Sequence, residues 1–266
     1  MKTKQNYAGS RRAIALAAAL MCVGSGLAFA QSASPLPPTK TNTWDTTAAA
    51  ALTLTRGNSQ TFLATVNVDT KAQWKEGDVL KNALLLGASA GYGNSTVNNT
   101  TTKNTDFLQG YGQFNHLFSD RFYGALRLDA QYDGIADIDY RLKVSPLAGY
   151  YLIKNDKMTL AVEAGPSLIS EHLDDQPYDA YWAFRAAERF EYKLSATTKV
   201  WETLEYLPKV DQWSENYLVN FEAGIDTSIT KRWSLRVVLQ DMYASEPAIG
   251  RKDNDIRLMA GTAYKF

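Results

Sequence analysis

After residue 42 the chain alternates apolar and polar residues along most of its length. Successive side chains of an extended strand point to opposite faces, so a period of two predicts strands with one apolar face and one polar face. Between Thr61 and Trp74, for example, Ala64, Val66 and Val68 alternate with polar neighbours. No long segment shows the helical period of 3.6 residues, and the pattern therefore predicts an all-β protein.

About twelve such segments follow one another, each of roughly 10–15 residues, which suits tilted strands that cross a bilayer. Strands in soluble sheets are shorter, at about five or six residues. The segments are Thr43–Thr55, Thr61–Trp74, Val79–Tyr92, Asp106–Phe118, Arg121–Tyr132, Tyr140–Leu152, Met158–Ser170, Ala180–Leu194, Thr198–Leu207, Ser214–Ile229, Trp233–Tyr243 and Asp255–Phe266.

The connections between these segments alternate in length. The short ones are Lys75–Asp78, Ser119–Asp120, Ile153–Lys157, Ser195–Thr197 and Thr230–Arg232. The longer polar ones are Gly93–Thr105, Asp133–Asp139, His172–Asp179, Pro208–Trp213 and Ala244–Asn254, with Arg56–Gln60 as a short exception. Short turns on one side and long loops on the other are typical of outer-membrane barrels. Because an unpaired sheet edge is costly in hydrocarbon, we predict a closed antiparallel up-and-down transmembrane β-barrel of about 12 strands over residues 43–266.

Aromatic residues near the strand ends are expected to mark the two boundaries between lipid and water. On the turn side they are Trp44, Trp74, Phe122, Tyr150, Trp233 and Phe266; on the loop side they are Phe62, Tyr92, Tyr132, Tyr140, Trp182 and Tyr243. The terminal Phe266 resembles the signal that barrel-assembly machinery recognises. Besides that machinery, we expect outer-membrane lipid and lipopolysaccharide as partners. The competing interpretation, a secreted periplasmic β-sandwich, predicts shorter strands and no terminal aromatic residue.

The first 30 residues have the pattern of a cleavable secretory signal peptide. Basic residues precede the apolar run Ala13–Val23, and Ala28-Phe29-Ala30 fits the cleavage rule. An uncleaved anchor would need about 20 continuous apolar residues. Residues 31–42 are rich in Ser, Pro and Thr and are expected to form a flexible periplasmic lead-in.

Composition narrows the function further. The 28 basic and 28 acidic residues balance, so the chain offers no basic footprint for nucleic acid. The single cysteine, Cys22, lies in the expected signal peptide, so the processed chain would have no disulfide and no Cys-ligated metal. We expect no cofactor.

Twelve tilted strands close into a barrel with a backbone radius of roughly 12 Å. Inward side chains fill about half of that radius. Two interpretations of the inward charges stay open. The charges either pair across the lumen and stiffen or plug the barrel, or they form a constriction that selects solutes. The alternation assigns to the lumen Arg127, Asp129, Arg141, Lys143, Glu163, Arg185, Arg189, Glu222, Arg236 and Arg257.

Candidate catalytic residues are few. Of the two histidines, His116 lies at a strand end, and His172 opens a loop that holds Asp174 and Asp175. An outer-membrane hydrolase, a protease or lipase with His172, loop carboxylates and Ser170 at the extracellular rim, is the alternative function. A solvated loop explains the same residues without chemistry, and the ligand spacing of a closed metal site is lacking. We therefore predict no enzyme, no catalytic residue and no metal site.

Four polar residues break the alternation by falling on the outward face. They are Asn82, Glu188, Glu202 and Asp241. A β-bulge near each would restore the phase, or the residue would lie among lipid headgroups, where a charge costs little.

Several motifs give the chain a family resemblance. These are Leu54–Ser59, the stretch from Asp139 to Leu152 with Gly149-Tyr150-Tyr151, the run Ala164-Gly165-Pro166, and the closing Tyr264-Lys265-Phe266. The sequence resembles the YdiY-like family of salt-induced outer-membrane proteins, a domain-of-unknown-function group. The resemblance implies a barrel in the bacterial outer membrane but supplies no catalytic or binding residues. Gly57, Asn58 and Gly149 are therefore interpreted as turn and strand-packing positions.

We thus expect an outer-membrane barrel that serves envelope structure or osmotic and salt stress, with a narrow channel for ions or small solutes as its most concrete activity.

Overall fold

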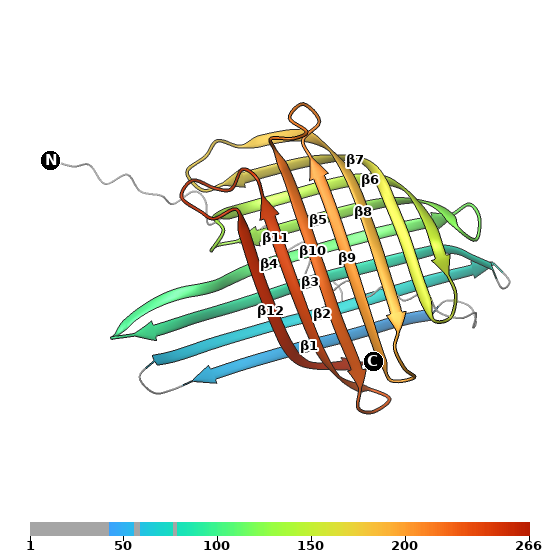
Figure 1. Cartoon of the computed structure of the whole chain (residues 1–266), viewed down its shortest axis with the longest axis horizontal. Helices are drawn as coiled ribbons and strands as arrows, with labels where there is room; N and C mark the ends of the chain where they lie inside the picture. Colours follow the sequence, from blue (N-terminus) through green and yellow to red (C-terminus); the bar gives the residue numbers. More distant parts are fainter. Residues whose placement is uncertain (1–42, 56–58, 77–78) are drawn as a thin grey trace.

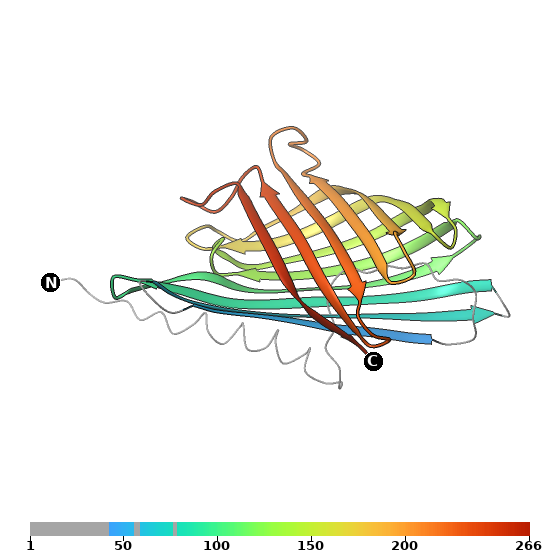
Figure 2. The same ribbon diagram turned by 60° about the horizontal axis from the view of Figure 1, so that its bottom comes forward.

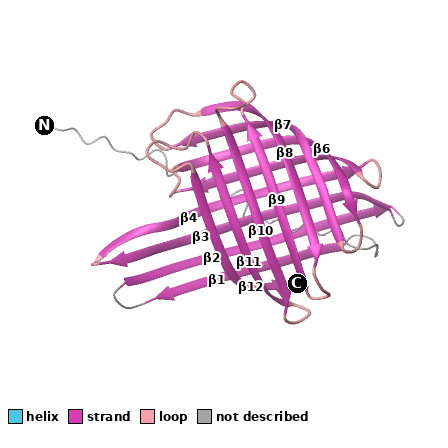
Figure 3. Ribbon diagram, in the orientation of Figure 1, coloured by secondary structure: helices cyan, strands magenta, loops and turns pink. Residues whose placement is uncertain are grey.

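The computed structural model describes residues 43–55, 59–76 and 79–266. Within them the chain forms one closed antiparallel barrel in which each strand pairs with its neighbours in sequence and β12 pairs with β1, which confirms the predicted fold (Figures 1 and 3). The strands are β1 (Thr43–Thr55), β2 (Ser59–Glu76), β3 (Val79–Val97), β4 (Thr100–Leu117), β5 (Phe122–Asp133), β6 (Ile138–Lys154), β7 (Met158–Leu173), β8 (Asp179–Lys193), β9 (Thr198–Pro208), β10 (Tyr217–Ser228), β11 (Trp233–Ala244) and β12 (Asn254–Lys265). Residues 1–42 and the turn positions Gly57 and Asn58 lie outside the described residues, so the expected signal peptide and lead-in have no structural counterpart here.

The short turns owe their shape to a side-chain oxygen at or near the start of each described turn. Ser119 Oγ accepts the Phe122 amide at 3.0 Å, and Asn155 Oδ1 accepts the Met158 amide at 2.9 Å. Ser195 does the same for Thr198, as does Thr230 for Trp233. Such Ser, Thr and Asn contacts replace a backbone partner within the turn and favour a tight reversal.

One predicted loop is wrong. Residues 93–105 were expected to be a long polar loop, but they continue β3 and β4 as a paired hairpin. The two strands reverse at Asn98 and Asn99, whose φ angles of 49° and 62° are those of a two-residue hairpin turn. Polar residues stabilise the pairing, since Thr96 and Thr101 share a hydrogen bond of 2.8 Å. Because β-branched threonine favours strands, polarity alone was a poor guide to this segment.

The closing seam between β1 and β12 is short. It holds four residue pairs, from Thr47 opposite Lys265 to Ala50 opposite Thr262, whereas β1 pairs with β2 along its whole length. The next shortest ladder, between β8 and β9, has eight pairs. The loop-side ends of β1 to β4 therefore project beyond the closed part of the barrel (Figures 1 and 2).

Close backbone approach helps the seam to form at Gly261. A Cβ atom at this position would lie 2.4 Å from the carbonyl oxygen of Ala50, which is far inside van der Waals contact. Glycine alone leaves room for the two strands to meet here.

Four interior aromatic rings lie over glycines on the neighbouring strand. In each pair the two residues are directly opposite, and a Cβ on the glycine would come within 2.3 Å of the ring. Each flat ring thus occupies the space that a side chain would need if any residue but glycine stood opposite it. The pairs are Gly87 with Tyr111, Gly91 with Phe107, Gly149 with Tyr123, and Gly224 with Trp201.

The outward face is apolar. Large hydrophobic side chains such as Leu126, Leu142 and Leu235 are about half exposed on it. Rings meet near both rims, with Trp44 and Trp74 centred 6.5 Å apart on the turn side and Phe62 and Tyr92 centred 6.4 Å apart on the loop side. The described residues form no helix, so this part of the chain has no apolar helix that could span a membrane.

Of the polar exceptions on this face, Asn82 has the expected bulge beside it, because the β2–β3 ladder shifts its register between Trp74 and Lys75. Asn82 is hydrogen-bonded to His116 at 2.8 Å on the turn side, where His116 also meets the ring of Phe118. The ladders that contain Glu188, Glu202 and Asp241 show no register shift, so the proposed bulges do not occur there. Glu202 instead lines an outer groove with apolar neighbours.

Candidate functional site

The candidate site is the lumen, where the structure places all ten charges assigned by alternation. Seven of them form ion pairs there with other described residues: Arg127, Asp129, Arg141, Lys143, Glu163, Arg185 and Arg236. Arg257 pairs with Asp133 nearer the loop side. Arg189 and Glu222 line a cavity in the middle of the lumen and take no part in these ion pairs.

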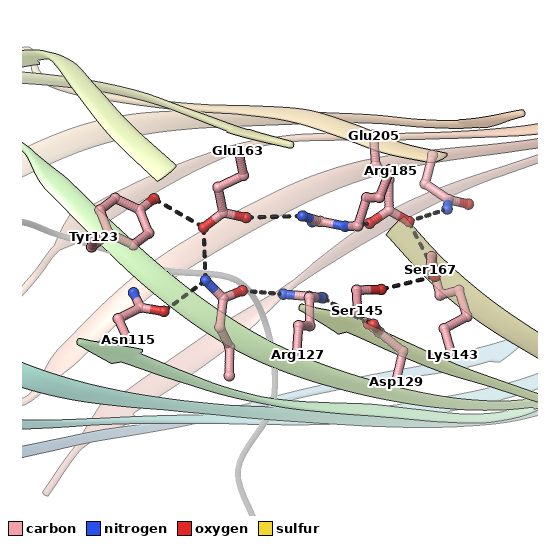
Figure 4. A network of polar contacts seen from close by, with 12 residues as sticks. Asn115, Tyr123, Arg127, Asp129, Lys143, Ser145, Glu163, Ser167, Arg185 and Glu205 are labelled. Carbon is pink, nitrogen blue, oxygen red and sulfur yellow. Dashed lines mark hydrogen bonds and ion pairs between the residues drawn. The ribbon is translucent and has the colours of Figure 1, made fainter. Parts of the chain in front are cut away.

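The largest polar network joins strands from β4 to β9 across the lumen (Figure 4). Arg185 donates to Glu163 at 2.9 Å and to Glu205 at 2.5 Å, and Lys143 also donates to Glu205 at 2.7 Å. Gln113 then joins Glu163 to the Arg127–Asp129 pair, through a donated bond of 2.7 Å and an accepted bond of 3.1 Å. Because only about 2% of the Arg185 side chain is exposed, its charge depends on these two carboxylates for stabilisation.

A second crossing lies closer to the turn side. Arg236 on β11 donates to Asp226 on the adjacent strand β10 at 2.8 Å, and to Asp69 on β2 at 3.1 Å. Strands β11 and β2 are not neighbours in the barrel, so this guanidinium spans the lumen. It therefore narrows the passage by tying two separate walls together.

The loop side is covered by residues 245–253, which connect β11 and β12. Ala248 packs into a small apolar cluster with Ile138 and Leu173. Arg251 forms an ion pair with Asp137 in the turn between β5 and β6, on the other side of the mouth. This connection is therefore a cover that is held by an apolar contact, an exposed ion pair, and hydrogen bonds from Asn216 to Glu246 and between Tyr217 and Ser245.

At least three cavities lie in the described lumen. The central one has a volume of about 150 Å³ and lies beside the large network. The turn-side one measures about 240 Å³ and includes Asp69, Asp226 and Arg236 in its wall. The smallest, about 40 Å³, lies beneath the loop-side cover. The lumen is thus not filled by apolar packing, and ion pairs cross it beside these cavities.

Sequence reasoning missed several members of these networks. Glu205 was overlooked because β9 was the least regular of the alternating segments, although its inward phase follows from Trp201 and Thr203. The neutral residues Gln113 and Tyr123 were missed because only charges were assigned to the lumen. Both are almost fully buried, and both donate to Glu163. Counting every polar residue on the inward phase of each strand would have found them.

The residues of the alternative hydrolase site do not form a connected set. His172 shares a 2.9 Å contact with Asp139 at the outer rim, and its ring stacks on Tyr140. Ser170 instead donates to the hydroxyl of Tyr178 at 3.2 Å. Within the described ranges, no hydrogen bond joins Ser170 to His172 and no group of three or more His, Cys, Asp or Glu residues is placed to hold a metal ion.

Comparison with known proteins gives one family and several similar folds. The model of a family described as a protein of unknown function, DUF481, matches residues 48–266, which agrees with the YdiY-like resemblance. No curated protein matches the chain. Solved structures with a similar fold include the translocator domain of the autotransporter NalP from Neisseria meningitidis, with 14% identity over 96% of this chain and 94% of that one and a TM-score of 0.41. The KdgM porin shows 11% identity, 84% and 99% coverage and a TM-score of 0.41; the NanC porin shows 7%, 83% and 96%, and 0.44.

Proposed function

We propose that this chain, which belongs to the DUF481 family of proteins of unknown function, forms a narrow passage for ions or small solutes through the bacterial outer membrane. The observation that carries the proposal is the polar lumen, in which cavities lie beside ion pairs that cross between strands.

The outward face supports the membrane location. A spanning sheet must pair every backbone group and present apolar side chains to lipid, and the closed barrel with its apolar face meets both needs. Lipid and lipopolysaccharide are accordingly the proposed surroundings. We also propose that Phe266, whose side chain is largely exposed beside Tyr264, is the residue that assembly machinery contacts.

The polar lumen favours a function as a restricted passage rather than a purely structural function of the barrel. Ion pairs such as Arg236–Asp69 hold polar walls together but leave cavities on either side of them. Charged constrictions of this kind control which solutes enter a pore. The physiological setting that the YdiY-like resemblance implies, adaptation of the envelope to salt, is part of this proposal.

Single-channel recording tests the passage. The refolded protein in a planar bilayer should show small, discrete conductance steps. Arg236→Ser should enlarge them, because it removes the side chain that joins β11 to β2, and should shift selectivity toward cations, because Asp69 and Asp226 remain. Arg121→Ser, in an exposed turn, is the matched control and should behave as the wild type.

Folding is verified first by the difference in gel mobility between heated and unheated samples. If neither the wild type nor Arg236→Ser produces discrete steps although both are folded, the lumen is sealed and the barrel is structural.

A further inference from the structure

Two buried charges of opposite sign face the central cavity without an ion pair. Arg189 on β8 has its Nε atom buried and without a hydrogen-bond partner in the described part of the chain. Glu222 on β10 is about nine-tenths buried and accepts from two neutral groups, Trp201 Nε1 at 3.1 Å and Gln240 Nε2 at 2.8 Å.

The opposite charges nearest to these two groups form ion pairs with other residues. Glu163 is the carboxylate with the strongest electrostatic effect on Arg189, but it is paired with Arg185. Arg236 has the strongest ionic effect on Glu222, but it is tied to Asp69 and Asp226. Arg189 and Glu222 therefore share the fields of opposite charges that are paired more tightly with other residues, and neither group has an ion pair of its own at the cavity.

Neutral acceptors in the same wall also lack donors. Gln240 Oε1 and Asn67 Oδ1 are both buried without a hydrogen-bond partner among the described residues. Gln240 is only about 7% exposed, and both side chains line the central cavity. Buried polar atoms in native proteins are nearly always paired with protein or with ordered water, so these two oxygens can accept hydrogen bonds from whatever fills the cavity, including the ammonium group of a solute.

We infer that the central cavity binds a small zwitterion of the amino-acid type during passage; this inference rests on the proposed function. The carboxylate of the ligand contacts the Arg189 guanidinium, and its ammonium group lies against Glu222 and the oxygens of Gln240 and Asn67. The cavity volume of about 150 Å³ equals that of about five waters, which suits a compact solute such as glycine.

The zwitterion fits better than simpler solutes because it leaves no charge unpaired. An anion would compensate Arg189 alone, and a cation would compensate Glu222 alone. A polyol would supply hydrogen bonds but no charge to either group, and charge-assisted hydrogen bonds are roughly twice as strong as neutral ones.

Equilibrium dialysis of radiolabelled glycine against the refolded wild type tests the inference. Glycine should bind saturably, β-alanine should compete, and acetate, ethylamine and glycerol should each compete at least about tenfold more weakly. Arg189→Gln and Glu222→Gln should each weaken glycine binding by about tenfold or more, since each removes one charge-assisted contact. The exposed substitutions Arg121→Gln and Glu215→Gln are the matched controls and should bind glycine as the wild type does.

Conductance in KCl, measured on the same preparation, separates the two proposals. Conductance without saturable glycine binding, or equal competition by glycerol, overturns the zwitterion site and leaves the passage in place. Glycine binding without conductance overturns the passage and leaves a binding site. If a lumen variant fails to fold, the competition series on the wild type still decides the question.

Discussion

At Gly149 the interior of the barrel has no room for a methyl group. A Cβ there would lie 2.2 Å from Cζ of Tyr123, whose ring is buried and cannot swing aside freely. The Tyr123 hydroxyl donates to Glu163 at 2.9 Å, and the ring also contacts Tyr151. The glycine therefore positions a tyrosine that in turn supports the large ion-pair network.

Gly149→Ala should lower the free energy of unfolding by about 1–3 kcal/mol, the usual cost of overpacking. Gly112→Ala is the matched control, because its Cβ would meet only Leu86, at 3.4 Å. Thermal conversion of the folded gel band in detergent measures both variants. Equal conversion temperatures for the two would show that Tyr123 moves aside without cost.

Alternation alone places the inward charges, because side-chain direction depends only on the phase along each strand. It does not tell which charges meet. Arg236 reaches Asp69, 167 residues earlier in the chain, only because tilt and stagger bring β2 and β11 to face each other across the lumen. Strand tilt and register are properties of the closed barrel, and a single strand does not carry them.

Among the elements, β1 and β12 form the weakest ladder of the described barrel. Their seam ends at Ala50 and Thr262. If it continued in register, Thr53 would oppose Met259. Instead, the loop-side half of β1 projects beyond the barrel with β2, as Figure 2 shows.

Cysteine pairs can measure the length of this seam in a Cys22→Ser background. Ala49→Cys with Ala263→Cys should cross-link on oxidation, because the two residues are direct partners, and should add about 2–4 kcal/mol of stability. Thr53→Cys with Met259→Cys should remain reduced. Cross-linking of the second pair as fast as the first would show that the seam extends further.

The ends of the projecting hairpins are the parts of the strands that the sequence pattern predicted least well. Strand number and order followed from alternation and loop lengths, because both reflect crossings of one apolar layer. The ends of β3 and β4 leave that layer, so their side chains no longer need to alternate in polarity. The remaining signal was the pair Asn98-Asn99, which suits the left-handed backbone of a two-residue turn.

Over the whole molecule, the cover formed by residues 245–253 joins the two sides of the loop-side mouth. Its ion pair, Arg251–Asp137, has side chains that are 43% and 22% exposed, so solvent ions reach it. The Debye length falls from about 10 Å at 0.1 M salt to about 3 Å at 1 M. Salt should therefore loosen the cover and leave the buried pairs of the lumen in place.

Hydrogen exchange of the cover should accelerate with salt, by up to about fivefold for a pair of this exposure. The Arg251 amide, which donates to the Ala248 carbonyl at 2.9 Å, is a suitable reporter. Asp137→Asn should exchange rapidly at all salt concentrations and lose the dependence. Lys103→Gln, which breaks an exposed pair on the projecting hairpin, should retain it. A salt response unchanged in Asp137→Asn would assign the loosening to another contact.

The four-pair seam also bears on biogenesis. Its last partners lie on β12, so the ring cannot be sealed until that strand has been delivered. Until then, the eleven-strand sheet has two edges with unpaired backbone groups, which are costly in hydrocarbon. A chain truncated before Thr262 would therefore become a substrate for proteases or aggregation, not a smaller pore.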